Sequence, residues 1–162
     1  MKKLIASFAV VFLLTAEILA ADKTPPPRVL GVKIGMKEEA VREFLRKIGK
    51  QHKEEKKEEE EEEGGEEEIW TLTNDKNYES LIVGFDRKHL VRYVSVFAGK
   101  NSSGKVLYGD IGDVKKARVE STGNNYRYTW DVAAKGKMPH YLVIARGTNS
   151  QNLSSLSIKR ID

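Results

Sequence analysis

The residues in this chain that could do chemistry are few and widely spaced. The lack of cysteine excludes a thiolate nucleophile, a cysteine-ligated zinc and any disulfide. None of the three histidines has a partner at the i, i+4 spacing of a helical metal site. A paired-carboxylate site would have to be assembled from aspartates that are distant in sequence, namely Asp75, Asp86, Asp110, Asp113 and Asp131. We therefore expect no catalytic residue, metal or cofactor, and an uncharacterised hydrolase is the weakest functional alternative.

Charge also constrains the function, because acidic and basic residues are segregated along the chain. The net charge of the 162 residues is +4, yet residues 53–68 contain eleven glutamates and three lysines. This acidic run has no apolar residue, so we expect a solvated insertion that buries nothing and is dispensable for folding. The rest of the chain is correspondingly basic. We expect residues 58–63 to compete with an anionic partner for basic side chains, among them Lys115, Lys116, Arg118 and Arg127.

The N-terminus has the features of a secretion signal. Lys2 and Lys3 precede an apolar run over residues 4–14, which is too short to span a bilayer, and small residues offer a cleavage site after Ala21. We expect residues 1–21 to be a signal peptide and the mature protein to be periplasmic or secreted. The alternative is a membrane tether formed by an uncleaved N-terminal segment. Residues 22–28 are proline-rich and are expected to be an extended linker.

The first half of the mature chain, residues 29–98, is expected to hold an entry strand, one helix and three strands. Period-two alternation of apolar residues predicts strands over residues 69–73, 81–85 and 90–98. An apolar stripe predicts an amphipathic helix over residues 36–48, with Gly49 as a left-handed cap. The pairs Glu38–Arg42 and Glu43–Lys47 have favourable i, i+4 spacing on its polar face.

The second half, residues 99–162, resembles the first half in its order of elements. Residues 110–120 predict a short helix with Asp113 as N-cap, and residues 126–132, 141–145 and 153–161 predict strands. Leu81 lies eleven positions after Trp70, and Tyr141 likewise lies eleven positions after Trp130. We therefore expect an α+β protein with an antiparallel sheet, helices packed on one face, and a tandem repeat of one helix and three strands.

Residues 30–98 hold a glycine-bounded helix with the spacing Met36-x-x-x-x-Val41, followed by Glu68-Ile-Trp70, Leu81-Ile-Val-Gly-Phe-Asp86 and Leu90-Val-Arg-Tyr-Val94. This pattern resembles the SmpA/OmlA (BamE-like) domain. The resemblance implies a fold class that includes tandem forms such as β-lactamase inhibitor protein. BamE-like proteins are lipoproteins, whereas this chain has no cysteine to acylate, and the acidic run is not part of the pattern. The resemblance therefore implies a fold and suggests an envelope role only by analogy.

The free face of the predicted sheet is the expected binding surface. Tyr93 and Phe97 in the first half and Arg127 in the second lie opposite the core-facing residues, and Lys115, Lys116 and Arg118 add positive charge. If the second half turns its other face outward, its exposed aromatic residues are instead Tyr126, Tyr128 and Trp130. We expect a non-catalytic envelope module that binds a protein or an anionic polymer or lipid, and no nucleic acid. The alternative is a secreted enzyme inhibitor that caps its target with this face.

Overall fold

The computed structural model describes residues 23–52, 66–99 and 105–161. The predictions for the signal peptide and for residues 58–63 of the acidic run lie outside the described residues. Within them, no helix is long and apolar enough to cross a membrane.

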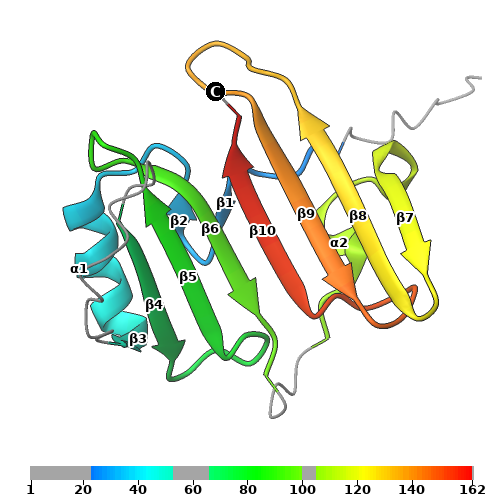
Figure 1. Cartoon of the computed structure of the whole chain (residues 1–162), viewed down its shortest axis with the longest axis horizontal. Coiled ribbons are helices and arrows are strands. Elements are labelled where there is room, and N and C mark those ends of the chain that lie inside the picture. The colour runs from blue at the N-terminus through cyan, green and yellow to red at the C-terminus, as the bar shows by residue number, and fades with distance from the viewer. Residues whose placement is uncertain (1–22, 53–65, 100–104, 162) are drawn as a thin grey trace, which may run out of the picture.

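One large antiparallel sheet organises the described residues (Figure 1). Its eight strands follow the order β3-β4-β5-β6-β10-β9-β8-β7, so the last strand of each half pairs with the other at the centre. The strands are β3 (Gly49–Gln51), β4 (Glu67–Leu72), β5 (Ser80–Phe85), β6 (Val91–Phe97), β7 (Arg118–Thr122), β8 (Asn125–Val132), β9 (Tyr141–Gly147) and β10 (Ser155–Arg160).

The predicted α+β class, with helices packed on one face and three strands in each half, is wrong. The described residues are mostly β, with 48% strand and 15% helix, and each half contributes four strands to the large sheet. The long helix is α1 (Glu38–Ile48). The helix expected over residues 110–120 is replaced by α2 (Tyr108–Ile111), a 3-10 turn η1 (Val114–Lys116) and the edge strand β7. Asp113 does cap η1 by accepting from the backbone N of Lys115.

The strand register also differs between the two halves. Trp70 lies opposite Leu81 in the β4–β5 pair, whereas Trp130 lies opposite Val143 in the β8–β9 pair. The hairpin that joins β8 to β9 is therefore longer by two residues, and the equal spacing from each tryptophan does not mark equivalent positions.

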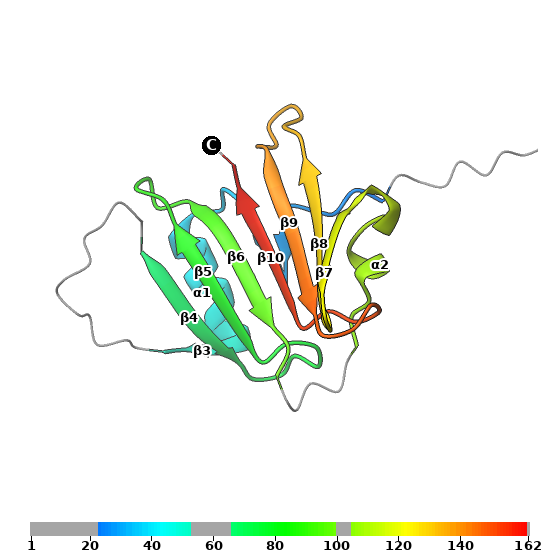
Figure 2. The same cartoon turned by 45° about the vertical axis from the view of Figure 1, so that its right-hand side comes forward.

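Apolar residues on one side of the sheet form the core. Trp70 and Trp130 are both buried there, as expected, together with the inward-facing residues of the four central strands, which include Leu81, Val83, Val94, Val96, Val143, Ala145, Leu156 and Ile158. Their cover is made of separate pieces: α1, which buries Val41 and Leu45, and a hairpin of β1 (Arg28–Val29) and β2 (Val32–Lys33). Figure 2 shows α1 behind β4 and β5, and Figure 1 shows the hairpin behind the sheet.

The proline-rich segment belongs to this cover from residue 23 onward. Pro25 is buried, and its carbonyl oxygen accepts a hydrogen bond of 2.6 Å from the hydroxyl of Tyr141. The backbone N of Asp113 donates to the carbonyl of Lys23 at 3.0 Å. A Cβ on Gly112 would lie 2.6 Å from Cγ of Pro25, so the segment packs closely on the second half. From residue 23 onward, this segment packs against the second half, whereas its composition predicts an extended linker.

Gly49 does not form the left-handed cap expected at the end of α1. Its φ of −162° is extended, and it opposes Leu72 as the first residue of β3. A Cβ at this position would lie 2.6 Å from the carbonyl oxygen of Thr71. Glycine is needed here because another backbone approaches closely, which lets the helix continue directly into an edge strand.

A buried polar cluster joins α1 to the sheet. The carboxylates of Glu38 and Glu68 are both buried, and the guanidinium of Arg42 contacts Glu38 at 2.5 Å and also contacts Glu68. Glu68 accepts a hydrogen bond of 3.0 Å from Nε1 of Trp70, and Glu38 lies 2.7 Å from Nδ1 of His89. Burial by itself lowers the pKa of Arg42, but the carboxylates, Glu68 foremost, raise it overall.

This cluster corrects two expectations. The Glu38–Arg42 pair forms at the predicted spacing, but Glu38 is buried and does not lie on a solvated helix face. The prediction that residues 53–68 bury nothing is wrong at their C-terminal end. Glu67 opens β4, and Glu68 occupies the core side of the sheet, where the arginine compensates its charge.

Arg42→Gln should destabilise the fold strongly, because it leaves two buried carboxylates without their cation. We expect the free energy of unfolding to fall by about 3 kcal/mol at neutral pH. Lys47→Gln on the same helix removes an exposed pair with Glu43 and should cost less than about 0.5 kcal/mol. Urea unfolding of both variants measures the difference. Equal losses would show that the buried cluster is not held by Arg42.

Candidate binding face of the sheet

The described helices and the β1–β2 hairpin lie on the core side, so nothing in the described part of the chain covers the other face of the sheet (Figures 1 and 2). We call this the uncovered face. Strand alternation assigns its side chains: Glu67, Ile69 and Thr71 on β4; Ser80, Ile82 and Gly84 on β5; Tyr93, Ser95 and Phe97 on β6; Ser155, Ser157 and Lys159 on β10; Leu142, Ile144 and Arg146 on β9; Arg127, Thr129 and Asp131 on β8; and Arg118 and Glu120 on β7.

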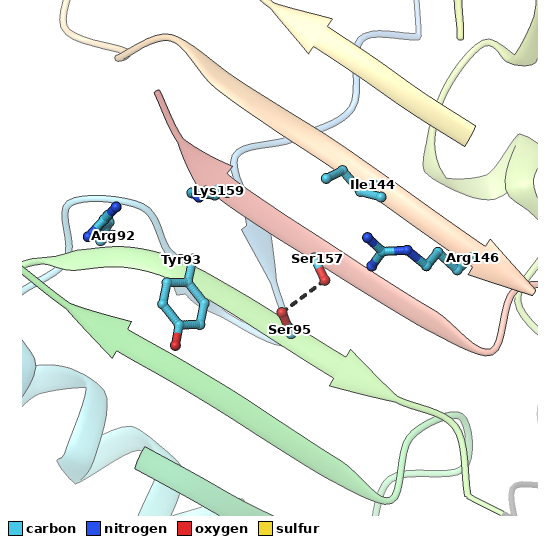
Figure 3. Close-up of a pocket in the computed structure, with 7 residues that line it drawn as sticks. All are labelled: Arg92, Tyr93, Ser95, Ile144, Arg146, Ser157 and Lys159. Carbon is cyan, nitrogen blue, oxygen red and sulfur yellow. Dashed lines mark hydrogen bonds between the residues drawn. The ribbon is translucent and has the colours of Figure 1, made fainter. Parts of the chain in front are cut away.

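The centre of the uncovered face contains a hollow of about 410 Å³ over β6, β10 and β9 (Figure 3). Its floor is the pair Ser95 and Ser157, directly opposite each other and joined by a hydrogen bond of 2.9 Å between their hydroxyls. The lining residues are Arg92, Tyr93, Ser95, Ile144, Arg146, Ser157 and Lys159. Small side chains on the two central strands make the depression, and longer side chains surround it.

A β-bulge brings Arg92 to the hollow. Gly84 opposes Tyr93 while the next residue, Phe85, opposes Val91, so Arg92 is the extra residue on β6. Strict alternation from Tyr93 would point the side chain of Arg92 to the core side. With the bulge, the buried Val91 takes that core position instead. Bulges often redirect a side chain in this way. Here the bulge lets two consecutive residues, Arg92 and Tyr93, line the same hollow.

Tyr93 leans across β5 and does not project outward. A Cβ built on Gly84 would lie 2.1 Å from Cε1 of Tyr93, so the ring occupies the space above that glycine. Figure 3 shows the ring turned away from β10, toward β5. Gly84 is buried beneath it. The phenol therefore forms one wall of the hollow.

Positive charge at the hollow is uncompensated. Arg92, Arg146 and Lys159 form no ion pair within the described residues, and Nε of Arg92 is buried without a hydrogen-bond partner. Toward the sheet edge the basic residues are paired, since Arg118 and Arg127 contact Glu120 at 3.2 and 3.4 Å. As far as residues 23–52, 66–99 and 105–161 show, the uncovered face is therefore most positive at its centre, and none of these residues that lines the hollow is acidic.

Three buried side-chain polar atoms in the described residues lack a hydrogen-bond partner, and all three lie on or beside the uncovered face. They are Nε of Arg92, Nε of Arg127 and Oγ1 of Thr129. Buried polar groups are normally satisfied, and one left unsatisfied costs roughly 1–3 kcal/mol. Each of these atoms is closed off from the surface in the isolated protein, so another molecule could reach it only if the side chain moved.

The structure brings together four of the residues predicted for binding. Tyr93, Phe97, Arg127 and Arg118 all belong to the uncovered face. Lys115 and Lys116 do not join them, because they belong to η1, and its N-cap Asp113 accepts a hydrogen bond through its carbonyl from Nε1 of the buried Trp130 on the core side. Arg146 and Lys159 were missed although they follow the same alternation as Arg127. Arg92 gave no alternation signal because the bulge redirects it.

The aromatic residues of β8 lie on the core side. Tyr128 stacks on Tyr108 of α2 with ring centroids 4.1 Å apart, and it is 6.2 Å from the ring of the buried Trp130. The alternative in which Tyr126, Tyr128 and Trp130 form the exposed face is therefore wrong. Stacking on a residue from α2 shows that this aromatic row contributes to packing between the second half and its cover.

The aspartates considered as a paired-carboxylate site each serve local structure. Asp75, Asp110 and Asp113 accept from backbone N–H groups of their own turns, Asp131 lies 2.5 Å from His140, and Asp86 pairs with Arg160 at 2.9 Å. Burial, with added repulsion from Asp75 and Asp110, raises the pKa of Tyr78 to about 12. In the described residues, no three His, Asp or Glu side chains are grouped as a metal site would require.

Asp86 fixes the turn between β5 and β6, close to the bulge. Burial disfavours its ionised form, but hydrogen bonds from the backbone N of Leu90 and Lys88 and the pairing with Arg160 together hold its pKa below the ordinary value. The carboxylate thus ties the turn to β10. The same turn leads into the part of β6 that carries Arg92.

Asp86→Asn should lower stability in a pH-dependent way. Because the pKa of Asp86 is lower in the folded state, its contribution is present above about pH 4, the ordinary aspartate value, and is lost as the pH falls through the folded pKa. We expect a loss of about 1–2 kcal/mol at pH 7 that shrinks toward zero in acid. Urea unfolding at a series of pH values measures it. A difference that stays constant with pH would contradict the role of the charge.

Gly84→Ala should displace the ring of Tyr93 and leave the sheet intact, because the ring can rotate away from the new Cβ. We expect the free energy of unfolding to change by less than about 1 kcal/mol. Gly49→Ala is the matched control, since its Cβ would meet a backbone oxygen, which cannot rotate away, and should cost about 2 kcal/mol. Urea unfolding and the NMR shifts of the Tyr93 ring distinguish them. Unchanged ring shifts in Gly84→Ala would show that the close contact is not present in solution.

The chain was compared with protein-family models, with curated proteins and with solved structures, and no match was found in any of the three. The function of the uncovered face is therefore inferred from its own residues.

Proposed function

We propose that this protein is an exported, non-catalytic binding module of the cell envelope that binds its partner with the uncovered face of the sheet. The observation that carries the proposal is the hollow at the centre of this face, where Arg92, Arg146 and Lys159 form no ion pair within the described residues. A partner that brings carboxylate or carbonyl acceptors to these cations would form charge-assisted hydrogen bonds, which are stronger than neutral ones. The predicted signal peptide supports export.

The composition of the uncovered face supports a protein partner. Its centre combines tyrosine, arginine and isoleucine side chains, and Phe97 is 36% exposed beside them. Aromatic residues and arginine are enriched at the centres of protein interfaces, where they carry most of the binding energy. Serine and glycine between them leave room for side chains of the partner. An anionic polymer or lipid would use only the charged part of this surface.

The size of the face also suits an interface. Eight neighbouring strands are about 34 Å across at the usual spacing, and strands of five to seven residues are about 20 Å long. The resulting area of roughly 700 Å² is close to what one partner contributes to a standard interface. The resemblance of residues 30–98 to SmpA/OmlA domains favours a partner in the envelope. A secreted inhibitor that caps an enzyme would use the same face.

Photo-crosslinking tests the proposal. A crosslinking amino acid placed at Ile82 or Ile144 on the uncovered face should capture a specific protein in the envelope of the source cells, whereas placement at the exposed Ala40 of α1 should not. Mass spectrometry identifies the captured protein, and an activity assay on it separates an inhibitor from a structural partner. The intact mass of the recovered module should correspond to a chain that begins at Asp22, which checks export separately.

Capture of the same protein from Ala40 as from the two isoleucines would contradict the use of the uncovered face. Capture from none of the three positions would contradict a protein partner. Recovery of the chain from the cytosol with Met1 still in place would overturn the envelope part of the proposal.

A further inference from the structure

We propose that the hollow at the centre of the uncovered face is a carboxylate-binding site that takes an extended acidic segment of the partner protein. This inference rests on the proposed function and specifies what the partner presents. Among the described residues that line the hollow, three are basic, namely Arg92, Arg146 and Lys159, and none is acidic. A ligand that enters it must therefore bring negative charge of its own.

The arrangement of the cations indicates an elongated ligand. Lys159 opposes Leu142 on β9, and Arg146 lies four residues further along that strand. Their backbone positions are therefore about 13 Å apart along the strand direction. Arg92 and Lys159 lie toward one end of the hollow and Arg146 toward the other, with the serine pair between them (Figure 3). Several carboxylates in a row match this spacing better than one oxyanion does.

An extended peptide has the right repeat for this site. Alternate residues of a strand point to the same side about 6.6 Å apart, so acidic residues at i, i+2 and i+4 would place carboxylates over about 13 Å. The end carboxylates would then meet Arg146 and the pair Arg92 and Lys159. Arginine binds carboxylate strongly through two parallel N–H donors, and neither Arg92 nor Arg146 forms an ion pair within the described residues. The hydroxyls of the serine pair lie beneath the middle position.

The apolar walls favour a peptide over a phosphate polymer or a membrane. Ile144 and the ring of Tyr93 line the hollow beside the cations, and both are only partly buried in the protein alone. A peptide can cover them with the aliphatic carbons of its own side chains. A polyphosphate chain carries no apolar atoms, and a flat layer of lipid head groups does not fill a recess.

Binding of poly-L-glutamate to the full mature chain tests the inference. At low salt we expect the substitution of all three cations, R92Q with R146Q and K159Q, to weaken binding about tenfold or more. The matched control is K115Q with K135Q and K137Q, which removes the same charge from exposed positions outside the hollow and should weaken binding less than about threefold. If the triple variant fails to fold, R146Q alone is measured in its place, because it alters only one exposed side chain.

Two further probes distinguish the chemistry. Polyphosphate and vesicles of phosphatidylglycerol should each bind more weakly than poly-L-glutamate at equal charge and should discriminate less between the two triple variants. Tighter binding of polyphosphate, with loss in the hollow variant, would replace the carboxylate site with a phosphate site. Equal losses in the two triple variants would show that the attraction is only general electrostatics. No measurable binding of poly-L-glutamate would also overturn the inference.

The crosslinking experiment separates this inference from the proposed function. If the hollow variant is still captured from Ile82 and Ile144 as efficiently as the unaltered chain, the uncovered face is an interface and the carboxylate site is not part of it. If the unaltered chain is captured from neither position, the proposed function itself fails. Loss of capture only in the hollow variant supports both.

Discussion

The antiparallel pairing of β6 with β10 is the contact on which the rest of the structure depends. It joins the last strand of each half, so that two sets of four strands become one sheet. The register of this pair places Val94 opposite Ile158 and Val96 opposite Leu156, which gives both halves the same core side. A shift by one residue would turn one half over and expose its apolar residues. A single shared register thus determines which face of the whole sheet stays open.

The same pair determines where the binding hollow lies. Opposite the apolar positions, the register aligns Ser95 with Ser157 and Tyr93 with Lys159. Small side chains therefore meet at the junction, while the bulge just beyond them adds Arg92. Stability and binding use opposite sides of the same two strands. A substitution on the uncovered face can change recognition while the core contacts stay in place.

The two faces also differ in how they handle charge. On the core side, the buried carboxylates of Glu38 and Glu68 share Arg42, and Trp70 and His89 satisfy further oxygens, so the cluster is compensated within the chain. On the uncovered face, three cations form no ion pair and three buried polar atoms have no hydrogen-bond partner within the described part of the chain. Uncompensated groups lower the stability of the isolated protein and provide binding energy to a complementary surface.

The sequence by itself determined the elements that carry a strong local period. The six strands from β4 to β6 and from β8 to β10, and the helix α1, lie within a few residues of where alternation and the apolar stripe placed them. The two edge strands were missed. All five residues of β7 are exposed, and β3 has only three residues, none of them buried. An edge strand with no buried face has no alternation to detect, because its formation depends on hydrogen bonds to a neighbouring strand.

Only the tertiary structure decided the features that depend on residues distant in sequence. The burial of Glu68 within a run of glutamates requires Arg42 to reach it from α1, and the packing of Pro25 requires Tyr141 and Gly112. Likewise, Arg92 joins the hollow because β6 gains one residue relative to β5. Local pattern predicts which face of a strand a residue occupies. It does not predict register, bulges or ion pairs, because these are set by which strands and helices become neighbours in the folded chain.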